Sequence, residues 1–170
     1  MYHYGNEEAV GNGIRRSGID RKELFLVTKV NFKSYDHTRE TVEQSMRLLG
    51  TDYLALVLLY WPFADYYRAW RELEALYRAG AVRAIGVSNF SVQQMQDAMR
   101  YAPLDALQPE YNLLTRGIEK DVLPFCAQNS ISVMTYNSIA KGILSGAFHF
   151  YGAQVTDFRT AKPLFQPEAL

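Results

Sequence analysis

The sequence predicts a parallel α/β fold, and three observations support this class. Short apolar runs rich in branched and aromatic residues recur along the chain, beginning at residues 24, 54, 82, 106 and 131. Segments with a helical period lie between them, and the spacing suits a strand followed by a helix and a right-handed return. We therefore expect a series of βα units joined into one parallel sheet.

Each apolar run is expected to be a buried strand, because a continuous apolar run is typical of a strand covered on both faces. The runs are Leu24–Val30, Leu54–Trp61, Val82–Ser88, Ala106–Tyr111 and Ile131–Tyr136. With 170 residues, of which 48% are hydrophobic and 14% aromatic, the chain can bury one sizeable core. Residues 1–170 are accordingly expected to form a single domain.

Two helices are predicted to end at a glycine, as helices commonly do. Thr38–Leu49 stops before Gly50, and Tyr67–Ala79 is followed by Gly80. Their apolar residues recur at helical spacing and should face the sheet. The first helix would present Val42, Met46 and Leu49, and the second Trp70, Leu73, Leu76 and Tyr77.

Further helix starts are indicated by capping residues. Ser91 followed by Gln94 forms a capping box, and Asn6 before two glutamates can cap a helix whose first turn carries negative charge. A fifth helix is expected over Ile118–Asn129. Each expected strand thus has a helix associated with it.

Charge and composition exclude several classes of partner. The 18 basic and 18 acidic residues balance and are scattered, which argues against nucleic acid or an anionic membrane surface. No stretch is long and apolar enough to span a bilayer, and no secretory signal is evident at the start. Cys126 is the only cysteine, and His3, His37 and His149 lack zinc-ligand spacing. We expect a cytoplasmic protein without a metal.

Two architectures fit a parallel α/β pattern of this length. A five-stranded open sheet of flavodoxin type would be complete, whereas an eight-stranded βα barrel usually needs about 250 residues. Polar or aromatic residues follow the expected strands, and in a barrel such positions converge on one mouth. They are Lys29, Tyr60 with Trp61, Ser88 with Asn89, Gln108, and Tyr136 with Asn137 and Ser138. This placement favours a barrel, here an incomplete one.

An ordered set of motifs carries a resemblance to a known family. They are Tyr-Gly-Asn-Glu-Glu-Ala-Val-Gly at 4–11, Thr-Lys-Val at 28–30, Trp-Pro at 61–62, Gly-Val-Ser-Asn-Phe at 86–90, Gln-Pro-Glu-Tyr-Asn at 108–112 and Lys-Gly-Ile-Leu at 141–144. In this order and spacing the chain resembles the aldo-keto reductases over nearly its whole length. The resemblance implies a parallel (β/α)8 TIM barrel, of which this chain would hold about five βα units, without the N-terminal strands and the C-terminal strand.

The chemistry that the resemblance implies is hydride transfer from a nicotinamide to a carbonyl carbon, with a tyrosine as acid. Tyr4 matches the proton donor and Lys29 its activator. A tyrosine pKa near about 10 makes a poor acid at neutral pH unless a neighbouring cation stabilises the anion. The implied cofactor is NADPH or NADH, and the implied substrate is a small carbonyl compound.

Further positions match the family's binding residues. Ser88, Asn89 and Gln108 would hold the nicotinamide carboxamide, Tyr136 would stack on its ring, and Asn137, Ser138 and Ile139 would approach the pyrophosphate. Trp61 and Phe63 would line an apolar substrate pocket. A glycine-rich dinucleotide motif is lacking, since Arg16 stands where the third glycine would be needed after Gly11 and Gly13.

The chain departs from the family pattern in three respects. The aspartate that precedes the catalytic tyrosine by five residues would fall before Met1, Tyr60 replaces the usual histidine, and the segment that holds the adenosine end of the cofactor is not represented. A tyrosine hydroxyl can still donate a hydrogen bond from that position. The alternative hypothesis is a catalytically inactive fragment or interaction protein that pairs exposed strand edges with another copy.

Overall fold

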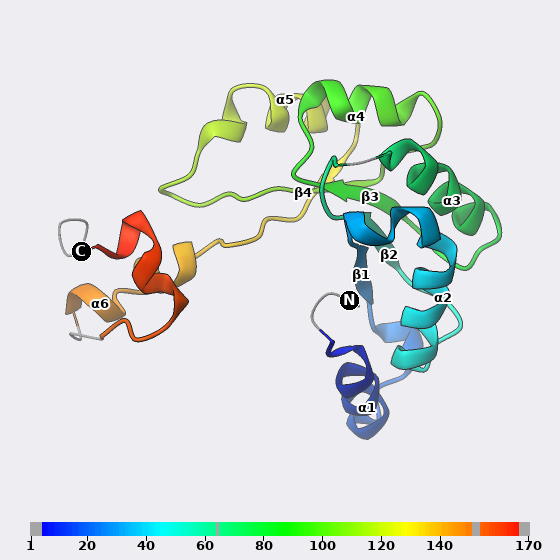
Figure 1. Ribbon diagram of the computed structural model, residues 1–170, viewed down its shortest axis with the longest axis horizontal. Helices are drawn as coiled ribbons and strands as arrows, with labels where there is room; N and C mark the ends of the chain where they lie inside the picture. The colour runs from blue at the N-terminus through cyan, green and yellow to red at the C-terminus, as the bar shows by residue number, and fades with distance from the viewer. Residues whose placement is uncertain (1–4, 64, 151–153, 167–170) are drawn as a thin grey trace. The chain divides into compact units, whose positions relative to one another are not determined.

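The computed structural model describes residues 5–63, 65–150 and 154–166, although the side chains of residues 149 and 150 are not described (Figure 1). The chain divides into two compact units. The sheet unit comprises the residues up to Pro109 together with Glu119–Met134, and the C-terminal unit comprises Glu110–Ile118 and the residues from Thr135 onward. Each unit is described by itself.

The sheet unit contains a five-stranded parallel sheet in the order β1-β2-β3-β4-β5. The strands are β1 Val27–Val30, β2 Leu56–Leu59, β3 Ile85–Ser88, β4 Ala106–Gln108 and β5 Ser132–Val133. Each lies inside a predicted run but is shorter than predicted. Ahead of β2 and β3 the sheet unit also has an isolated bridge between Leu54 and Val82, and the C-terminal unit has one between Glu110 and Tyr136.

Alternate residues along each strand point to opposite faces of the sheet. Neighbouring strands are in register so that Leu58 pairs with Gly86 and Gly86 with Ala106. Because successive side chains point to opposite faces, these residues share one face, here called the inner face. Leu56, Leu58 and Ala106 form an apolar cluster there with Ala84 and Met134. The other face carries fully buried residues such as Val57, Ile85 and Leu107.

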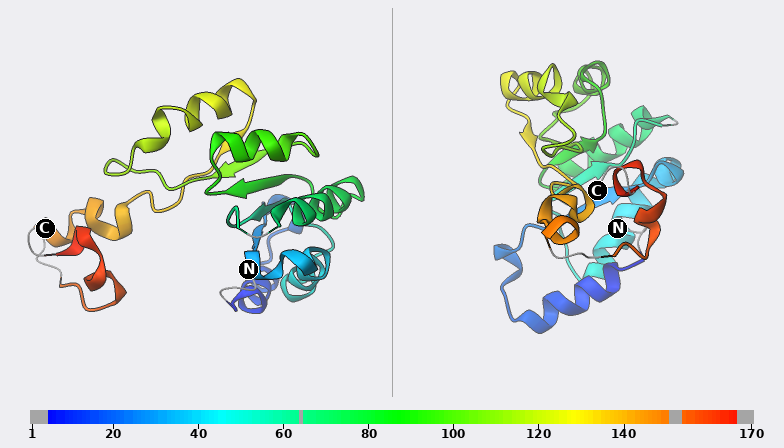
Figure 2. Two further views of the ribbon diagram at one scale, coloured as in Figure 1. Left: turned by 45° about the horizontal axis from the view of Figure 1, so that its top comes forward. Right: turned by 90° about the vertical axis from the view of Figure 1, so that its left-hand side faces the viewer.

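Helices alternate with the strands in chain order, beginning with α1 before β1, and are arranged in an arc along one side of the sheet (Figures 1 and 2). They are α1 Glu7–Ser17, α2 Thr38–Leu49, α3 Tyr66–Arg78, α4 Val92–Met99 and α5 Val122–Gln128. Helix α2 contacts β1, and α3 contacts β2 and β3. The parallel α/β class predicted from the sequence is confirmed.

The predicted helix faces are largely present. In α3, Trp70, Leu73 and Leu76 are buried, while Tyr77 is half-buried. In α2 the buried positions include Val42, Ser45 and Leu49, and Met46 is only half-buried. The sequence predicted Met46 on the packed face because methionine is apolar. In the structure the neighbouring Ser45 is the more buried of the two side chains.

The helix ends show which capping predictions were right. Gly50 ends α2 in the left-handed conformation at φ 69°, which a glycine adopts without steric penalty. Ser91 and Gln94 form both bonds of the capping box at the start of α4. Helix α1 begins directly after Asn6 with Glu7 and Glu8 in its first turn, as predicted, but the Asn6 side chain makes no capping bond, so that part of the prediction was wrong. The predicted fifth helix begins later, at Val122, after a 3₁₀ turn at Gly117–Glu119.

The C-terminal unit consists of short turns of helix. A 3₁₀ segment at Ala140–Ser145 leads into α6 Ala147–Phe150, and two further 3₁₀ turns follow at Phe158–Ala161 and Pro163–Phe165. Within the described residues, no helix combines the length and apolar character needed to cross a membrane. Over the same part of the chain, no group of three or more histidine, cysteine, aspartate or glutamate side chains could hold a metal ion.

Candidate active site

The polar residues at the strand ends of the sheet unit belong to the inner face. Lys29 pairs with Leu58 in the sheet, and Ser88 pairs with Gln108. Tyr60 lies two residues beyond Leu58, and Gln108 two beyond Ala106, so the pleat directs all of them to the same side. The structure therefore brings Lys29, Tyr60, Ser88 and Gln108 to the carboxyl end of one sheet face.

Lys29 is a half-buried amine at this edge. Its Nζ lies 5.5 Å from the centroid of the Tyr60 ring, within the range of a cation–π contact. Burial lowers the pKa of Lys29 from its ordinary value, because desolvation disfavours the charged form. Among the described residues, no carboxylate forms an ion pair with Lys29.

A pocket of about 340 Å³ opens beside Lys29. Lys29 and Gln108 line it from β1 and β4, Met134 from the residue after β5, and Asn6, Glu7 and Val10 from α1 and the residue before it. Two of the lining residues are joined by a hydrogen bond of 2.8 Å, from Thr28 Oγ1 to Oε1 of the buried Glu7 carboxylate. This bond ties the start of α1 to the strand that carries Lys29.

Tyr4 lies outside the described residues, so its predicted position next to Lys29 is not tested. The residues that follow it in the chain, Asn6 and Glu7, line the same pocket as Lys29. Sequence reasoning missed the role of Glu7, which was interpreted only as a negative charge at a helix start. Its place within a motif that begins at Tyr4 was the available signal.

Ser88, Asn89 and Gln108 form a hydrogen-bonded corner. The buried Ser88 hydroxyl donates to the Gln108 carbonyl at 2.7 Å, and Asn89 Nδ2 donates to the Tyr60 carbonyl at 3.2 Å and to Ser88 Oγ at 3.1 Å. Asn89 has φ 63°, a conformation that asparagine tolerates better than most residues. Within the described part of the chain the Gln108 side-chain amide has no hydrogen-bond partner, and it lines the pocket. Its donor and acceptor suit a carboxamide ligand.

Aromatic rings form a wall beyond the ends of β1 and β2. Trp61 and Phe63 stack at 5.6 Å with an interplanar angle of 13°, and Phe32 meets Phe63 edge-on at 5.6 Å. Phe63 is 51% exposed. The predicted pair Trp61 and Phe63 is thus in contact, and Phe32 was missed because it precedes a segment with no strand or helix pattern.

The remaining predicted residues lie in the C-terminal unit. Tyr136 is half-buried, and its pKa is raised by burial and, to a smaller extent, by Glu110. Asn137, at φ 57°, donates from Nδ2 to the Glu110 carboxylate and accepts from the Lys141 N–H at 2.8 Å. Ser138 Oγ bonds the Thr135 hydroxyl at 3.0 Å, while Ile139 is 59% exposed.

Asn112 supports the same turn by donating from Nδ2 to the Asn137 carbonyl at 3.1 Å. Glu110 and Asn112 belong to the Gln-Pro-Glu-Tyr-Asn motif but were not identified as functional residues. Their signal was the occurrence of two polar side chains directly after a strand. Asn112 bonds the backbone of the turn that follows Tyr136, and Glu110 bonds the Asn137 side chain within it.

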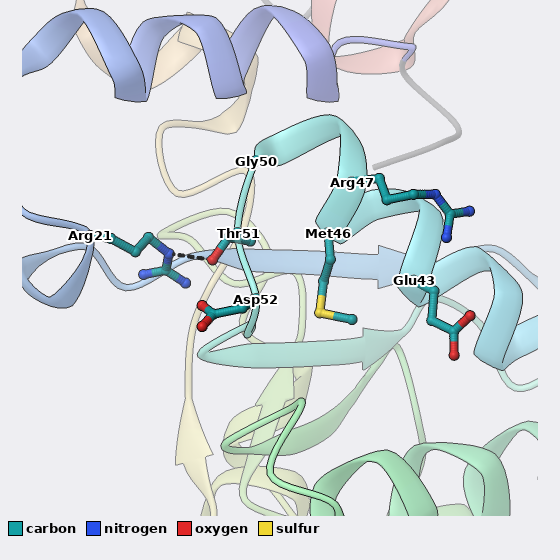
Figure 3. Close-up of a pocket in the computed structure, with 7 residues that line it drawn as sticks. All are labelled: Arg21, Glu43, Met46, Arg47, Gly50, Thr51 and Asp52. Atoms are coloured by element: carbon teal, nitrogen blue, oxygen red, sulfur yellow. Dashed lines mark hydrogen bonds between the residues drawn. The ribbon is translucent and has the colours of Figure 1, made fainter.

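A hollow larger than the Lys29 pocket lies elsewhere in the sheet unit, where α2 ends and the chain enters β2 (Figure 3). Its volume is about 770 Å³, and Arg21, Met46 and Asp52 are among its lining residues. The Arg21 guanidinium donates to Thr51 Oγ1 at 2.7 Å and to the Tyr53 carbonyl at 2.8 Å. These bonds join loops at the amino ends of the strands, which in βα barrels is the stabilising end and not the catalytic one.

Comparison with known proteins decides the family. The model of the aldo/keto reductase family matches residues 1–163. The chain belongs to the aldo/keto reductase family. Two curated relatives from Bacillus subtilis are each 37% identical: aldo-keto reductase YhdN, over 97% of this chain and 54% of the relative, and glyoxal reductase, over 83% of this chain and 52% of the relative.

Solved aldo-keto reductase structures match the fold as well. Glycerol dehydrogenase AKR11B4 from Gluconobacter oxydans has a TM-score of 0.84 at 30% identity, covering 96% of this chain and 54% of that one. An aldo/keto reductase from Klebsiella pneumoniae in complex with NADP has a TM-score of 0.74 at 35% identity, covering 86% and 53%. The chain therefore spans about half the length of these proteins, and its sheet is an incomplete βα barrel of their type, as the sequence predicted.

Proposed function

We propose that this chain carries the catalytic face of an NAD(P)H-dependent reductase that converts aldehydes or ketones to alcohols. The observation that carries the proposal is the hydrogen bond between Thr28 and Glu7 in the wall of the Lys29 pocket. It holds the residues that follow Tyr4 beside the strand residue next to Lys29. Such an arrangement would allow a phenol and an amine separated by 25 positions to meet.

A nicotinamide held by these residues would supply the hydride that reaches the carbonyl carbon. Tyr4 donates its phenolic proton to the carbonyl oxygen, so that one hydride and one proton complete the alcohol. The Lys29 ammonium lowers the pKa of the phenol by stabilising its anion. Tyr60 occupies the position of the family's usual histidine and donates a hydrogen bond to the same oxygen.

The cofactor residues are proposed from their chemistry. The free amide of Gln108, with Asn89 and Ser88 beside it, orients the nicotinamide carboxamide. Tyr136 offers a flat ring for stacking, and the turn of Asn137, Ser138 and Ile139 receives the pyrophosphate. NADPH is the cofactor we favour, because two of the related Klebsiella pneumoniae structures hold NADP or NADPH.

The substrate is proposed to be a small carbonyl compound held against Trp61 and Phe63. One relative is named a glyoxal reductase, so a reactive dicarbonyl is a suitable first substrate. The cytoplasm is the setting we propose, because Cys126 is a free, buried thiol.

The test is consumption of NADPH by the purified chain with glyoxal, followed by absorbance. We expect Tyr4→Phe and Lys29→Met to abolish turnover while NADPH binding, measured by fluorescence, persists. Tyr101→Phe is the matched control, since that tyrosine is 52% exposed and lies outside the proposed site. Equal rates in the parent and Tyr4→Phe would remove Tyr4 from the mechanism.

The same assay distinguishes the alternative hypothesis. If the folded parent chain consumed no NADPH with any carbonyl compound tested, a non-catalytic interaction protein would be the better description. Tyr60→His is informative here, because it restores the family's usual residue. Turnover that appears only in Tyr60→His would locate the defect at this position.

A further inference from the structure

The Arg159 side chain contacts several separate segments of the described part of the C-terminal unit. Its guanidinium forms a two-pronged ion pair with Asp157, with Nε to Oδ1 at 2.9 Å and a terminal nitrogen to Oδ2 at 3.0 Å. The other terminal nitrogen donates to the backbone carbonyl of Lys141 at 3.0 Å. One side chain therefore joins the 157–159 segment to a turn 18 positions earlier.

Two aromatic rings hold this guanidinium in place. Its central carbon lies 5.4 Å from the Phe148 ring centroid and 5.6 Å from that of Phe165, and the two rings meet edge-on at 5.4 Å. Only 26% of the Arg159 side chain is exposed. A fixed, forked donor of this kind can define the position of a carbonyl group more strictly than a mobile surface lysine could.

The turn that receives this bond has an unfavourable backbone. Ala140, Lys141 and Gly142 have φ values of 49°, 55° and 103°, and the first two carry side chains that disfavour the left-handed region. The turn persists only if surrounding contacts hold it. At Gly142 a β-carbon would come within 3.3 Å of the Arg159 guanidinium, so the absence of a side chain there allows the close approach.

We propose that Arg159 is a positioning residue that holds the Ala140–Gly142 turn, and through it the adjoining residues Asn137–Ile139, in the conformation needed to receive the cofactor's pyrophosphate. This inference rests on the proposed function, since it assumes that the turn beginning at Asn137 approaches the cofactor. The N–H groups of Ala140, Lys141 and Gly142 all donate within the turn, so the pyrophosphate would meet the preceding residues Ser138 and Ile139, whose positions the turn sets. Asn137 and Arg159 hold the turn from opposite ends, through the Lys141 N–H and the Lys141 carbonyl.

The first test compares two ligands by fluorescence titration. Arg159→Met should weaken NADPH binding about tenfold, the equivalent of one hydrogen bond to a charged group. It should leave the binding of reduced nicotinamide riboside, which has no phosphate, unchanged. The proposal would be overturned if the affinities for both ligands fell equally, or if neither affinity fell.

A second substitution separates positioning from general loss of structure. Lys141→Gly in the Arg159→Met background should restore NADPH affinity, because glycine adopts positive φ without the steric penalty. Lys162→Gly is the matched control, since Lys162 lies at φ −98° outside the turn, and it should restore nothing. Failure of Lys141→Gly to restore affinity would show that Arg159 does not act through the turn.

A third measurement needs no cofactor. The amide groups of Gly142 and Leu144 both donate to the Ile139 carbonyl, at 3.0 and 3.2 Å, so their hydrogen exchange reports the integrity of the turn. Exchange should be faster in Arg159→Met and slow again with Lys141→Gly. If the parent did not bind NADPH, the proposed function would fail, while unchanged exchange in Arg159→Met would refute the role of Arg159 independently.

Discussion

The phenol of Tyr35 bonds both polar backbone atoms of Trp61. Its hydroxyl donates to the Trp61 carbonyl and accepts from the Trp61 N–H at 3.2 Å. Tyr35 is only 3% exposed and belongs to the 3₁₀ segment Phe32–His37 after β1, whereas Trp61 follows β2. A single side chain thus fixes the backbone from which the aromatic wall of Trp61 and Phe63 extends.

Replacing Tyr35 with phenylalanine should lower the free energy of unfolding by about 1–3 kcal/mol, because two backbone groups of Trp61 lose their partner. Urea unfolding of the sheet unit within the whole chain measures the change. Tyr101→Phe is the control, because that ring is 52% exposed. A Tyr35→Phe variant as stable as the control would contradict the assigned bonds.

Alkaline pH should destabilise the chain through the same residue. Burial raises the pKa of Tyr35 from 10.0 to about 12. Between these values the unfolded chain releases the phenolic proton while the folded chain retains it, so stability is intact below pH 10 and falls as the pH rises toward 12. Thermal unfolding followed across this window should show a shallower decline in Tyr35→Phe, and an unaltered slope would assign the decline to other groups.

Gly86 should tolerate no side chain. A β-carbon there would overlap the Ala106 carbonyl of the paired strand and lie 2.6 Å from a methyl group of Leu58. We expect Gly86→Ala to destabilise the chain by about 1–3 kcal/mol, as overpacking does. Gly13→Ala is the matched control, because α1 has open space there and alanine should stabilise the helix by up to about 1 kcal/mol. Denaturant midpoints of the two variants should move in opposite directions.

Lys29→Met should make the chain more stable while removing the activity proposed for it. The lowered pKa of Lys29 means that the folded state disfavours the ammonium, so stability is fully present above the ordinary value of 10.5 and is lost as the pH falls through the folded pKa. The methionine side chain cannot be protonated, so the variant does not lose this stability as the pH falls. Its advantage in unfolding free energy should therefore be present at neutral pH and vanish above pH 10.5. An advantage independent of pH would indicate better packing instead.

The outer edge of β1 is proposed to mediate association between copies. In the described sheet β1 is an edge strand; Phe25, two residues before it, is 69% exposed, and Val27, its first residue, is 37% exposed. Sedimentation should show concentration-dependent association that Val27→Lys reduces, because an edge lysine opposes strand pairing. Ile19→Lys is the control for an added charge on an exposed apolar residue outside the strand. A monomer at all concentrations would count against the proposal.

Local pattern was sufficient to locate the elements of the sheet unit. The apolar runs placed all five strands, and the glycine stop at Gly50 placed the end of α2 correctly. Strand lengths were overestimated because apolar residues also continue beyond regular pairing, as at Leu54. Asn6 failed as a capping side chain because capping depends on the actual rotamer and not only on the residue type.

The sequence by itself determined the fold class, the family and the set of polar residues at the strand ends, because each is encoded in periodicity or in contiguous motifs. Only the tertiary structure decided which distant residues meet: Thr28 with Glu7, Tyr35 with Trp61, and Arg159 with Lys141 are separated by 21, 26 and 18 positions. Such bonds depend on how whole elements pack together. They cannot be predicted from local sequence preferences, because neither partner's sequence neighbourhood indicates which distant residue will come within hydrogen-bond distance.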